Sequence, residues 1–153
     1  KVPFLINDHV TWVEEVEADG VHIGQADMKL DEARSILGED KIIGATASCV
    51  SEALRAEKEG ADYLGCGHIF PTITKKKTTP PIGLDGLQKV VDVVSIPVVA
   101  IGGITIGSVA KIMERGAAAV AMVSEIEKHP DPVSACREVQ RNALSKANSS
   151  NWK

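Results

Sequence analysis

The chain has 153 residues, 44% of them hydrophobic and 25% charged, values typical of a single folded domain rather than a disordered or fibrous protein. The net charge is −4 and only 3% of the residues are aromatic. We therefore expect no nucleic-acid partner, which would need basic stripes and exposed rings, and no apolar run is long enough to suggest a membrane. Cys49, Cys66 and Cys136 form no C-x-x-C pair, and we interpret them as buried, reduced thiols of a cytoplasmic protein.

Short runs rich in valine and isoleucine alternate with longer charged segments along the chain. The runs predict six strands, at residues 2–6, 20–24, 41–45, 62–66, 96–101 and 119–123. The segments between them have the periodicity of amphipathic helices, at residues 12–17, 30–37, 51–59, 84–93, 108–115 and 132–143. Local signals mark helix ends: Thr105 and Gly116 flank the fifth helix, and Asp131 precedes Pro132 at the start of the sixth.

This alternation predicts an α/β fold with parallel strands and right-handed crossovers. An open doubly wound sheet and a (βα)8 TIM barrel both fit, but polar residues follow the carboxyl end of nearly every strand, which favours the single rim of a barrel. Six units are two fewer than a closed barrel contains. We therefore expect residues 1–143 to form a barrel domain without its two N-terminal units, completed by another segment or as a homo-oligomer. Residues 144–153 are expected to be a tail or linker.

Two acidic residues follow neighbouring predicted strands: Asp8 the first and Asp27 the second. Carboxylates on one rim can share Mg²⁺, which needs few protein ligands and often holds substrate phosphates. Solvated or helix-capping acids are the alternative interpretation. Asn7, beside Asp8, offers a neutral polar contact. None of the four histidines has the i, i+4 spacing of a zinc helix, so we expect no zinc site.

Gly102 and Gly103 end the fifth predicted strand, and Ser124 follows the sixth. Glycines let backbone N–H groups approach an anion, and the loops after the last two strands of a barrel commonly bind phosphate. A tight turn without a ligand is the alternative.

Residues 67–87 form a long polar loop, which is typical of a lid or binding loop. Thr72 and Thr74 are two residues apart, so in extended backbone their hydroxyls point the same way. Lys75 follows them as a point charge that can neutralise phosphate. His68 ends the fourth predicted strand and is a candidate acid–base group, although a packed structural histidine is the alternative.

Six blocks of the sequence, in order, resemble thiamine-phosphate synthase: LIND, GVHIGQADM, IIGATAS, GADYLGCGHIFPTITKK, IPVVAIGGIT and AVAMVSEI. The resemblance covers about residues 2–126 and implies a (βα)8 barrel. It also implies a magnesium-dependent transferase of thiamine biosynthesis. That enzyme joins 4-amino-2-methyl-5-hydroxymethylpyrimidine diphosphate to 4-methyl-5-(2-hydroxyethyl)thiazole phosphate, giving thiamine phosphate and diphosphate.

The resemblance implies a role for each matching residue. It assigns Mg²⁺ binding to Asp8 and Asp27, pyrimidine diphosphate binding to Asn7 and Thr46, and a catalytic contact with the diphosphate to Lys75. The residues implied to bind the thiazole phosphate are Thr72, Ile73, Thr74, Gly102, Gly103, Val123 and Ser124. Where Thr46 stands the family usually has serine, a change that retains the hydroxyl.

Two departures from the family pattern matter. An arginine and a lysine that hold the diphosphate on an earlier strand have no counterpart here, so we expect weak diphosphate binding. His68 stands where the synthase often has proline and where the related thiazole tautomerase has its acid–base histidine. Asp27 and the PTITKK block favour the synthase, because a tautomerase releases no diphosphate. A non-catalytic module that binds a phosphorylated ligand is a third hypothesis.

Overall fold

The computed structural model describes residues 2–74 and 79–145. Within them, strands and helices alternate in the predicted order. The strands are β1 (Leu5–Asn7), β2 (Gly20–Ile23), β3 (Ile42–Ala47), β4 (Tyr63–Gly67), β5 (Val98–Ile101) and β6 (Ala119–Ala121). The helices are α1 (Trp12–Glu15), α2 (Leu30–Leu37), α3 (Val50–Lys58), α4 (Gly83–Val91), the 3₁₀ turn η1 (Ile106–Ser108), α5 (Val109–Glu114), α6 (Ser124–Glu127) and α7 (Pro132–Leu144).

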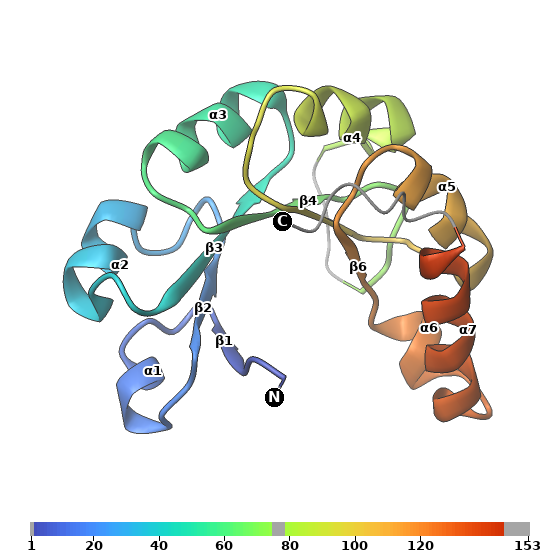
Figure 1. The fold of residues 1–153 in the computed structure, drawn as a ribbon, viewed down its shortest axis with the longest axis horizontal. Helices are drawn as coiled ribbons and strands as arrows, with labels where there is room; N and C mark the ends of the chain where they lie inside the picture. The colour runs from blue at the N-terminus through green and yellow to red at the C-terminus, as the bar shows by residue number, and fades with distance from the viewer. Residues whose placement is uncertain (1, 75–78, 146–153) are drawn as a thin grey trace.

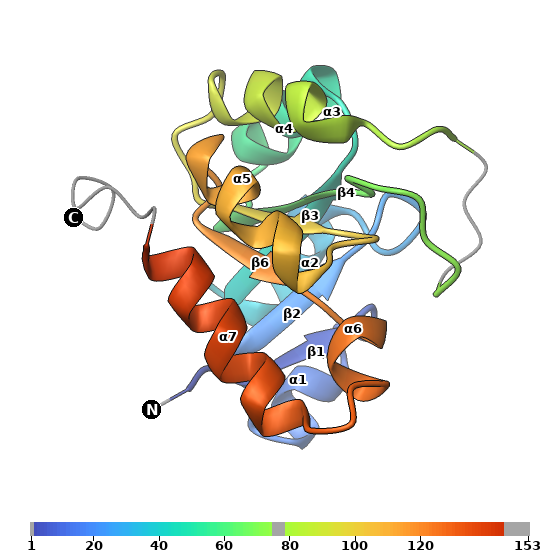
Figure 2. The ribbon, with the colours of Figure 1, turned by 90° about the vertical axis from the view of Figure 1, so that its right-hand side faces the viewer.

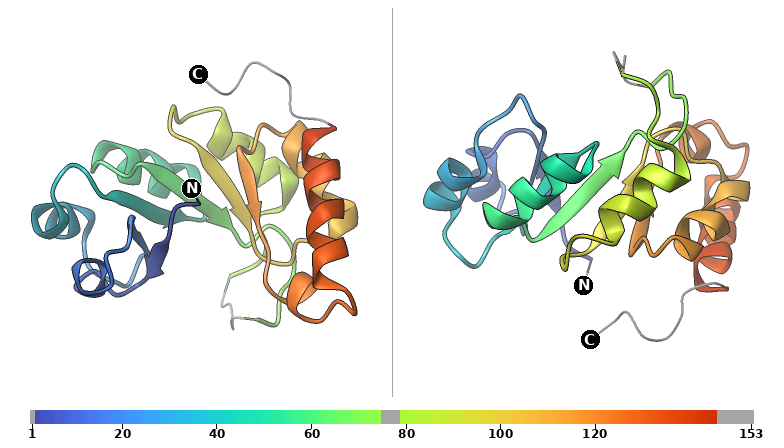
Figure 3. Two further views of the ribbon diagram at one scale, coloured as in Figure 1. Left: turned by 60° about the horizontal axis from the view of Figure 1, so that its bottom comes forward. Right: turned by 90° about the horizontal axis from the view of Figure 1, so that it is seen from above.

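The six strands form one parallel sheet in sequence order, from β1 at one edge to β6 at the other. The sheet curls, and the helices lie around its outer side, so the described chain forms part of a barrel wall (Figure 1). Two further views show α3 and α4 over the middle of the sheet and α7 beyond β6 (Figure 3). This arrangement confirms the prediction of an α/β fold of the TIM-barrel type with six βα units.

The hydrophobic core lies between the sheet and the helices. Every second residue of the central strands points outward, and these side chains are almost fully buried: Val21, Ile23, Ile43, Ala45, Leu64, Cys66, Val98 and Ala100. Burial of one valine, leucine or isoleucine side chain contributes about 1.5–3 kcal/mol. The outer face therefore stabilises the fold, and the inner face is left to smaller and more polar residues.

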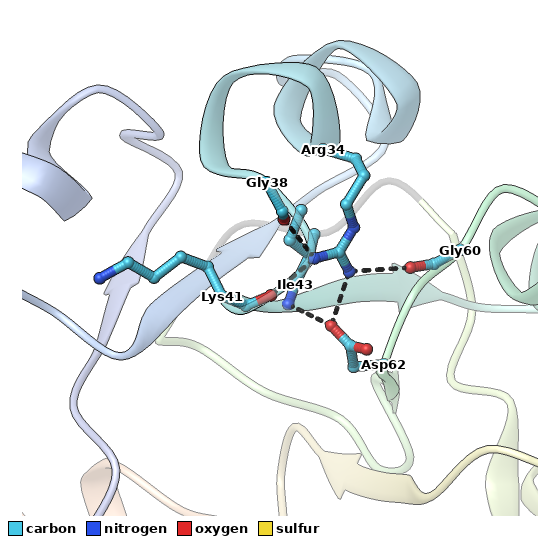
Figure 4. A network of polar contacts seen from close by, with 6 residues as sticks. All are labelled: Arg34, Gly38, Lys41, Ile43, Gly60 and Asp62. Atoms are coloured by element: carbon cyan, nitrogen blue, oxygen red, sulfur yellow. Dashed lines mark hydrogen bonds and ion pairs between the residues drawn. The ribbon is translucent and has the colours of Figure 1, made fainter.

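A network of polar contacts closes the amino-terminal ends of the middle strands (Figure 4). Arg34 of α2 donates to the carbonyl oxygens of Gly38, Lys41 and Gly60 and to Asp62 Oδ2. The same carboxylate oxygen accepts from the N–H of Ile43 at 2.7 Å. The network ties α2 to the segments that enter β3 and β4, at the end of the sheet opposite the predicted rim.

Several local predictions are confirmed. Asp131 Oδ1 accepts from the N–H of Ser134 at 3.0 Å and caps α7. Gly116 has φ +84° after α5, the left-handed conformation that glycine adopts easily. Beyond Thr105 the chain first forms η1, so α5 begins at Val109 instead of residue 108.

Other local predictions are wrong. The first strand begins at Leu5, not residue 2. Phe4, just before it, bonds to Asp19 twice: its N–H donates to Asp19 Oδ2, a side-chain acceptor, and its carbonyl oxygen accepts from the Asp19 N–H, both at 2.8 Å. The sixth strand ends at Ala121, and the carbonyl oxygen of Val123 already accepts helical bonds of α6, which was not predicted. Of the cysteines only Cys66 is buried. All three are free thiols, and the exposed ones are Cys49, which precedes α3, and Cys136 of α7. Among the described residues, no helix is long and apolar enough to cross a membrane.

Candidate active site

A cavity of about 250 Å³ opens at the carboxyl ends of the strands. All six strands or the loops that follow them contribute to its lining. It brings together ten residues singled out in the sequence: Asn7, Asp8, Thr46, His68, Thr72, Thr74, Gly102, Gly103, Val123 and Ser124. These residues span more than a hundred positions of the chain, and they meet because parallel strands end at one rim.

Two predicted site residues lie outside this cavity, and a third is not among the described residues. Asp27 borders an adjoining cavity of about 390 Å³, and Gly24 lines both cavities. Ile73 is 89% exposed and does not line the site. Lys75 lies outside the residues that the structure describes.

The two acids are positioned by their own loops. Asp8 has φ +66°, a left-handed conformation that aspartate tolerates better than most residues, and its N–H donates to the carbonyl oxygen of His22 at 2.9 Å. Asp27 Oδ2 accepts from the N–H of Gly24 at 2.7 Å, which closes the turn after β2. Burial lowers the pKa of His22, and the charges of both acids partly counteract that lowering, so both act on the same imidazole although they border different cavities.

His22, Tyr63 and Thr46 form a hydrogen-bonded network across the inner face. His22 Nδ1 lies 3.0 Å from the Tyr63 hydroxyl, and Nε2 lies 3.0 Å from Thr46 Oγ1. Burial lowers the pKa of His22, and the charges of Asp8 and Asp27 oppose that shift. The lowered pKa favours the neutral form of the imidazole, whose Nε2 contact holds the Thr46 hydroxyl at the rim.

Two glycines make room for this network. A Cβ atom at Gly44 would lie 2.1 Å from the Tyr63 ring, and one at Gly65 would lie 2.7 Å from His22 Cε1. Tyr63 was missed in the sequence; the available signal was a glycine on each of two neighbouring strands, Gly44, which pairs with Tyr63, and Gly65, which pairs with Thr46. Gln25 was also left out of the predicted site. Its side-chain amide donates to the Thr46 carbonyl oxygen, and its amide oxygen accepts from Arg55 of α3.

Gly102 and Gly103 pack closely against the loop after β4. Their φ angles are +95° and +67°. A Cβ atom at Gly102 would lie 2.5 Å from His68 Cβ, and one at Gly103 would lie 2.4 Å from the carbonyl oxygen of Pro71. Both positions therefore require glycine for the contact between the two loops, whatever ligand they bind.

His68 is only 5% exposed and borders the cavity beside Gly102. An imidazole in this place can exchange a proton with a molecule in the cavity. Small hydroxyl-bearing side chains, glycine-rich backbone, a carboxylate and an imidazole make a cavity suited to a polar, phosphorylated ligand.

Comparisons with known proteins identify the family of this chain. Residues 1–126 match the family model for thiamine monophosphate synthase. The thiamine-phosphate synthase of Chlorobium phaeovibrioides is 46% identical over 129 residues, which are 84% of this chain and 62% of that protein. The corresponding protein of Clostridium botulinum is 48% identical over 131 residues, 86% of this chain and 64% of that protein. This chain thus spans less than two thirds of the length of these relatives.

Solved structures give the same result. A structure described as thiamine phosphate pyrophosphorylase from Pyrococcus furiosus has a TM-score of 0.89 and 38% identity, covering 96% of this chain and 70% of that one. Inosine 5′-monophosphate dehydrogenase of Legionella pneumophila shares only the fold, with a TM-score of 0.69 and 20% identity over all of this chain and 58% of that one. With most of its length matched by the family model, this chain belongs to the thiamine monophosphate synthase family.

Proposed function

We propose that this chain carries the main part of the active site of a thiamine-phosphate synthase. The reaction would join 4-amino-2-methyl-5-hydroxymethylpyrimidine diphosphate to 4-methyl-5-(2-hydroxyethyl)thiazole phosphate, giving thiamine phosphate and diphosphate. The observation that carries the proposal is the cavity at the rim, which gathers the polar residues that follow β1, β4, β5 and β6. Family membership supports the same reaction.

In this proposal the lining of the cavity is divided between two phosphorylated ligands. Asn7, Asp8 and Thr46 line it from the ends of β1 and β3 and would bind the pyrimidine diphosphate. Thr72 and Thr74 line it from the loop after β4, and the loops after β5 and β6 supply Gly102, Gly103, Val123 and Ser124 for the thiazole phosphate. Two reactants held in one cavity no longer have to meet by diffusion, which lowers the entropic part of the barrier.

The chemistry needs stabilisation of negative charge more than it needs a nucleophile from the protein. As the bond to the pyrimidine methylene carbon breaks, negative charge grows on the leaving diphosphate, and the thiazole nitrogen attacks the carbon. Lys75 would neutralise part of that charge, and backbone N–H groups beside Gly102 and Gly103 would hold the other phosphate.

Asp8 and Asp27 are the residues that would hold a magnesium ion in this proposal. Their oxygen atoms are the ligands that Mg²⁺ prefers, and the charges of both carboxylates counteract the burial that lowers the pKa of His22. No group of three or more His, Cys, Asp or Glu residues suited to a metal occurs among the described residues. That finding fits Mg²⁺, which relies on water and substrate oxygens for the remaining ligands. When bound, the ion would neutralise charge on the diphosphate.

His68 supports a second candidate, a thiazole tautomerase. Its nearly buried imidazole borders the same cavity, next to the glycines proposed to hold the thiazole phosphate. It could move a proton on the bound thiazole without any second substrate.

Incubation with both substrates, with and without Mg²⁺, tests these functions. Release of diphosphate that depends on Mg²⁺ and falls in Asp8→Asn supports the synthase. Isomerisation of a thiazole phosphate tautomer without the pyrimidine, lost in His68→Asn, supports the tautomerase instead. Binding of thiazole phosphate with neither activity would reduce the chain to a ligand-binding module.

A further inference from the structure

Ile106, at the start of η1, is held through both of its backbone polar groups by side chains of other helices. Its N–H donates to Glu125 Oε1 of α6 at 3.1 Å, and its carbonyl oxygen accepts from Asn142 Nδ2 of α7 at 3.1 Å. All three residues are partly buried. The first N–H groups of a helix have no partner inside the helix, so Glu125 supplies an acceptor that η1 itself lacks.

The bond from Ile106 to Glu125 joins two loops that border the cavity. Gly102 and Gly103 begin the loop after β5, and Ser124 lies next to Glu125 in the segment after β6. The bond therefore sets the separation of the two segments proposed to bind the thiazole phosphate. The Gly102 carbonyl oxygen accepts from the N–H of Phe70 at 3.0 Å, which anchors the start of the loop, and the bond at Ile106 is a second tether further along the same segment.

Asn142 extends this support to α7, which lies beyond the residues matched by the family model. α7 packs against η1, α5 and α6 (Figure 2). Within this packing Asn142 presents a donor to Ile106, from a position 36 residues further along the chain. The helix thus contacts the β5 loop through a directional bond as well as through packing.

We propose that Glu125 and Asn142 are positioning residues that hold residues 102–108 in the conformation that binds the phosphate of the thiazole substrate. The inference rests on the proposed function, since that function assigns the phosphate to this loop. Both side chains act through Ile106 rather than by touching the substrate. Their loss should therefore weaken binding of the phosphate group and leave recognition of the thiazole ring unchanged.

Titration of the protein with 4-methyl-5-(2-hydroxyethyl)thiazole phosphate and, separately, with its dephosphorylated alcohol tests this role. We expect Glu125→Ala and Asn142→Ala each to weaken binding of the phosphate about fivefold, the effect of one ordinary hydrogen bond. Affinity for the alcohol should not change. Glu125→Gln keeps an acceptor for the Ile106 N–H and should restore phosphate affinity. Gln140→Ala, an exposed change on the same helix, is the matched control.

If Asn142→Ala does not fold, Asn142→Leu keeps the approximate shape without the donor and should give the same loss. If the alanine variants bind the phosphate with wild-type affinity, the inference is wrong. It is also wrong if their affinity for the alcohol falls equally, because a general structural defect would lower both affinities. Failure of the wild-type protein to bind the phosphate would overturn the phosphate assignment as well, so the two failures are distinguishable. Faster amide exchange at Ile106 in Glu125→Ala would support the tether itself.

Discussion

Replacing Arg34 with alanine removes the side chain that ties α2 to the entries of β3 and β4. Its guanidinium donates to the carbonyl oxygens of Gly38, Lys41 and Gly60 at 3.0, 2.7 and 3.2 Å, and to Asp62 Oδ2 at 2.8 Å. The Arg34 side chain is 17% exposed, so water replaces these bonds only in part. A net hydrogen bond contributes about 1 kcal/mol, and several acceptors reach solvent. We therefore expect the free energy of unfolding to fall by about 2–3 kcal/mol.

Arg115→Ala is the matched control. Arg115 makes one contact of 3.3 Å with Asp85, and the two side chains are 39% and 88% exposed. Exposed pairs of this kind contribute about 0–1 kcal/mol. Urea unfolding followed by circular dichroism measures both variants against the wild-type protein. A loss in Arg34→Ala no larger than in Arg115→Ala would refute the importance given to the network.

Three other changes have expected outcomes. Hydrogen bonds from Ser95 lower the pKa of Glu57. The contribution of Glu57 to stability is therefore present above the ordinary pKa of 4.5 and is lost as the pH falls through the lowered pKa. Glu57→Gln should make the free energy of unfolding, measured in urea, depend less on pH in this acid range. Gly44→Ala should cost about 1–3 kcal/mol by overpacking against Tyr63, unlike Gly107→Ala, where a Cβ meets open space. Lys75→Ala should reduce turnover about 100-fold, and unchanged diphosphate release would remove it from the mechanism.

The fold was predictable because each βα unit carries its own signals. The apolar run at residues 96–101 predicted a strand, and β5 occupies Val98–Ile101, although its inner face is not covered and Ile101 is 40% exposed. The helix predicted at residues 30–37 is α2. The ends of short elements were less predictable, because they depend on single contacts from elsewhere. The N–H of Phe4, just before β1, donates to the Asp19 carboxylate, a bond between residues 15 positions apart.

Much of the candidate site was predictable for a topological reason. In a parallel sheet every strand ends at the same rim, so a polar residue after a strand can be placed without knowing its partners. That reasoning located Asn7, Thr46 and Ser124. It did not place Asp27, whose carboxylate turns back to the N–H of Gly24 and borders the adjoining cavity.

The inner network was not predictable in the same way. Tyr63 meets His22 only because glycine occupies positions 44 and 65 on neighbouring strands, and that match depends on the register of three strands at once. The tether at Ile106 likewise depends on how α7 packs, which no local signal in residues 132–144 reveals.

The contacts at the two ends of the sheet have different roles. At the amino-terminal ends, Arg34 and Glu57 satisfy backbone groups that enter β3, β4 and β5, and none of the described residues of the candidate site is among their partners. At the carboxyl ends, glycines and polar residues border an open cavity, and Glu125 holds a loop rather than the core. Changes at the first end should therefore alter the free energy of unfolding with little effect on ligand affinity, and changes to the loop tethers should do the reverse. This separation lets the loops of one rim vary in chemistry while the same buried outer face maintains the fold.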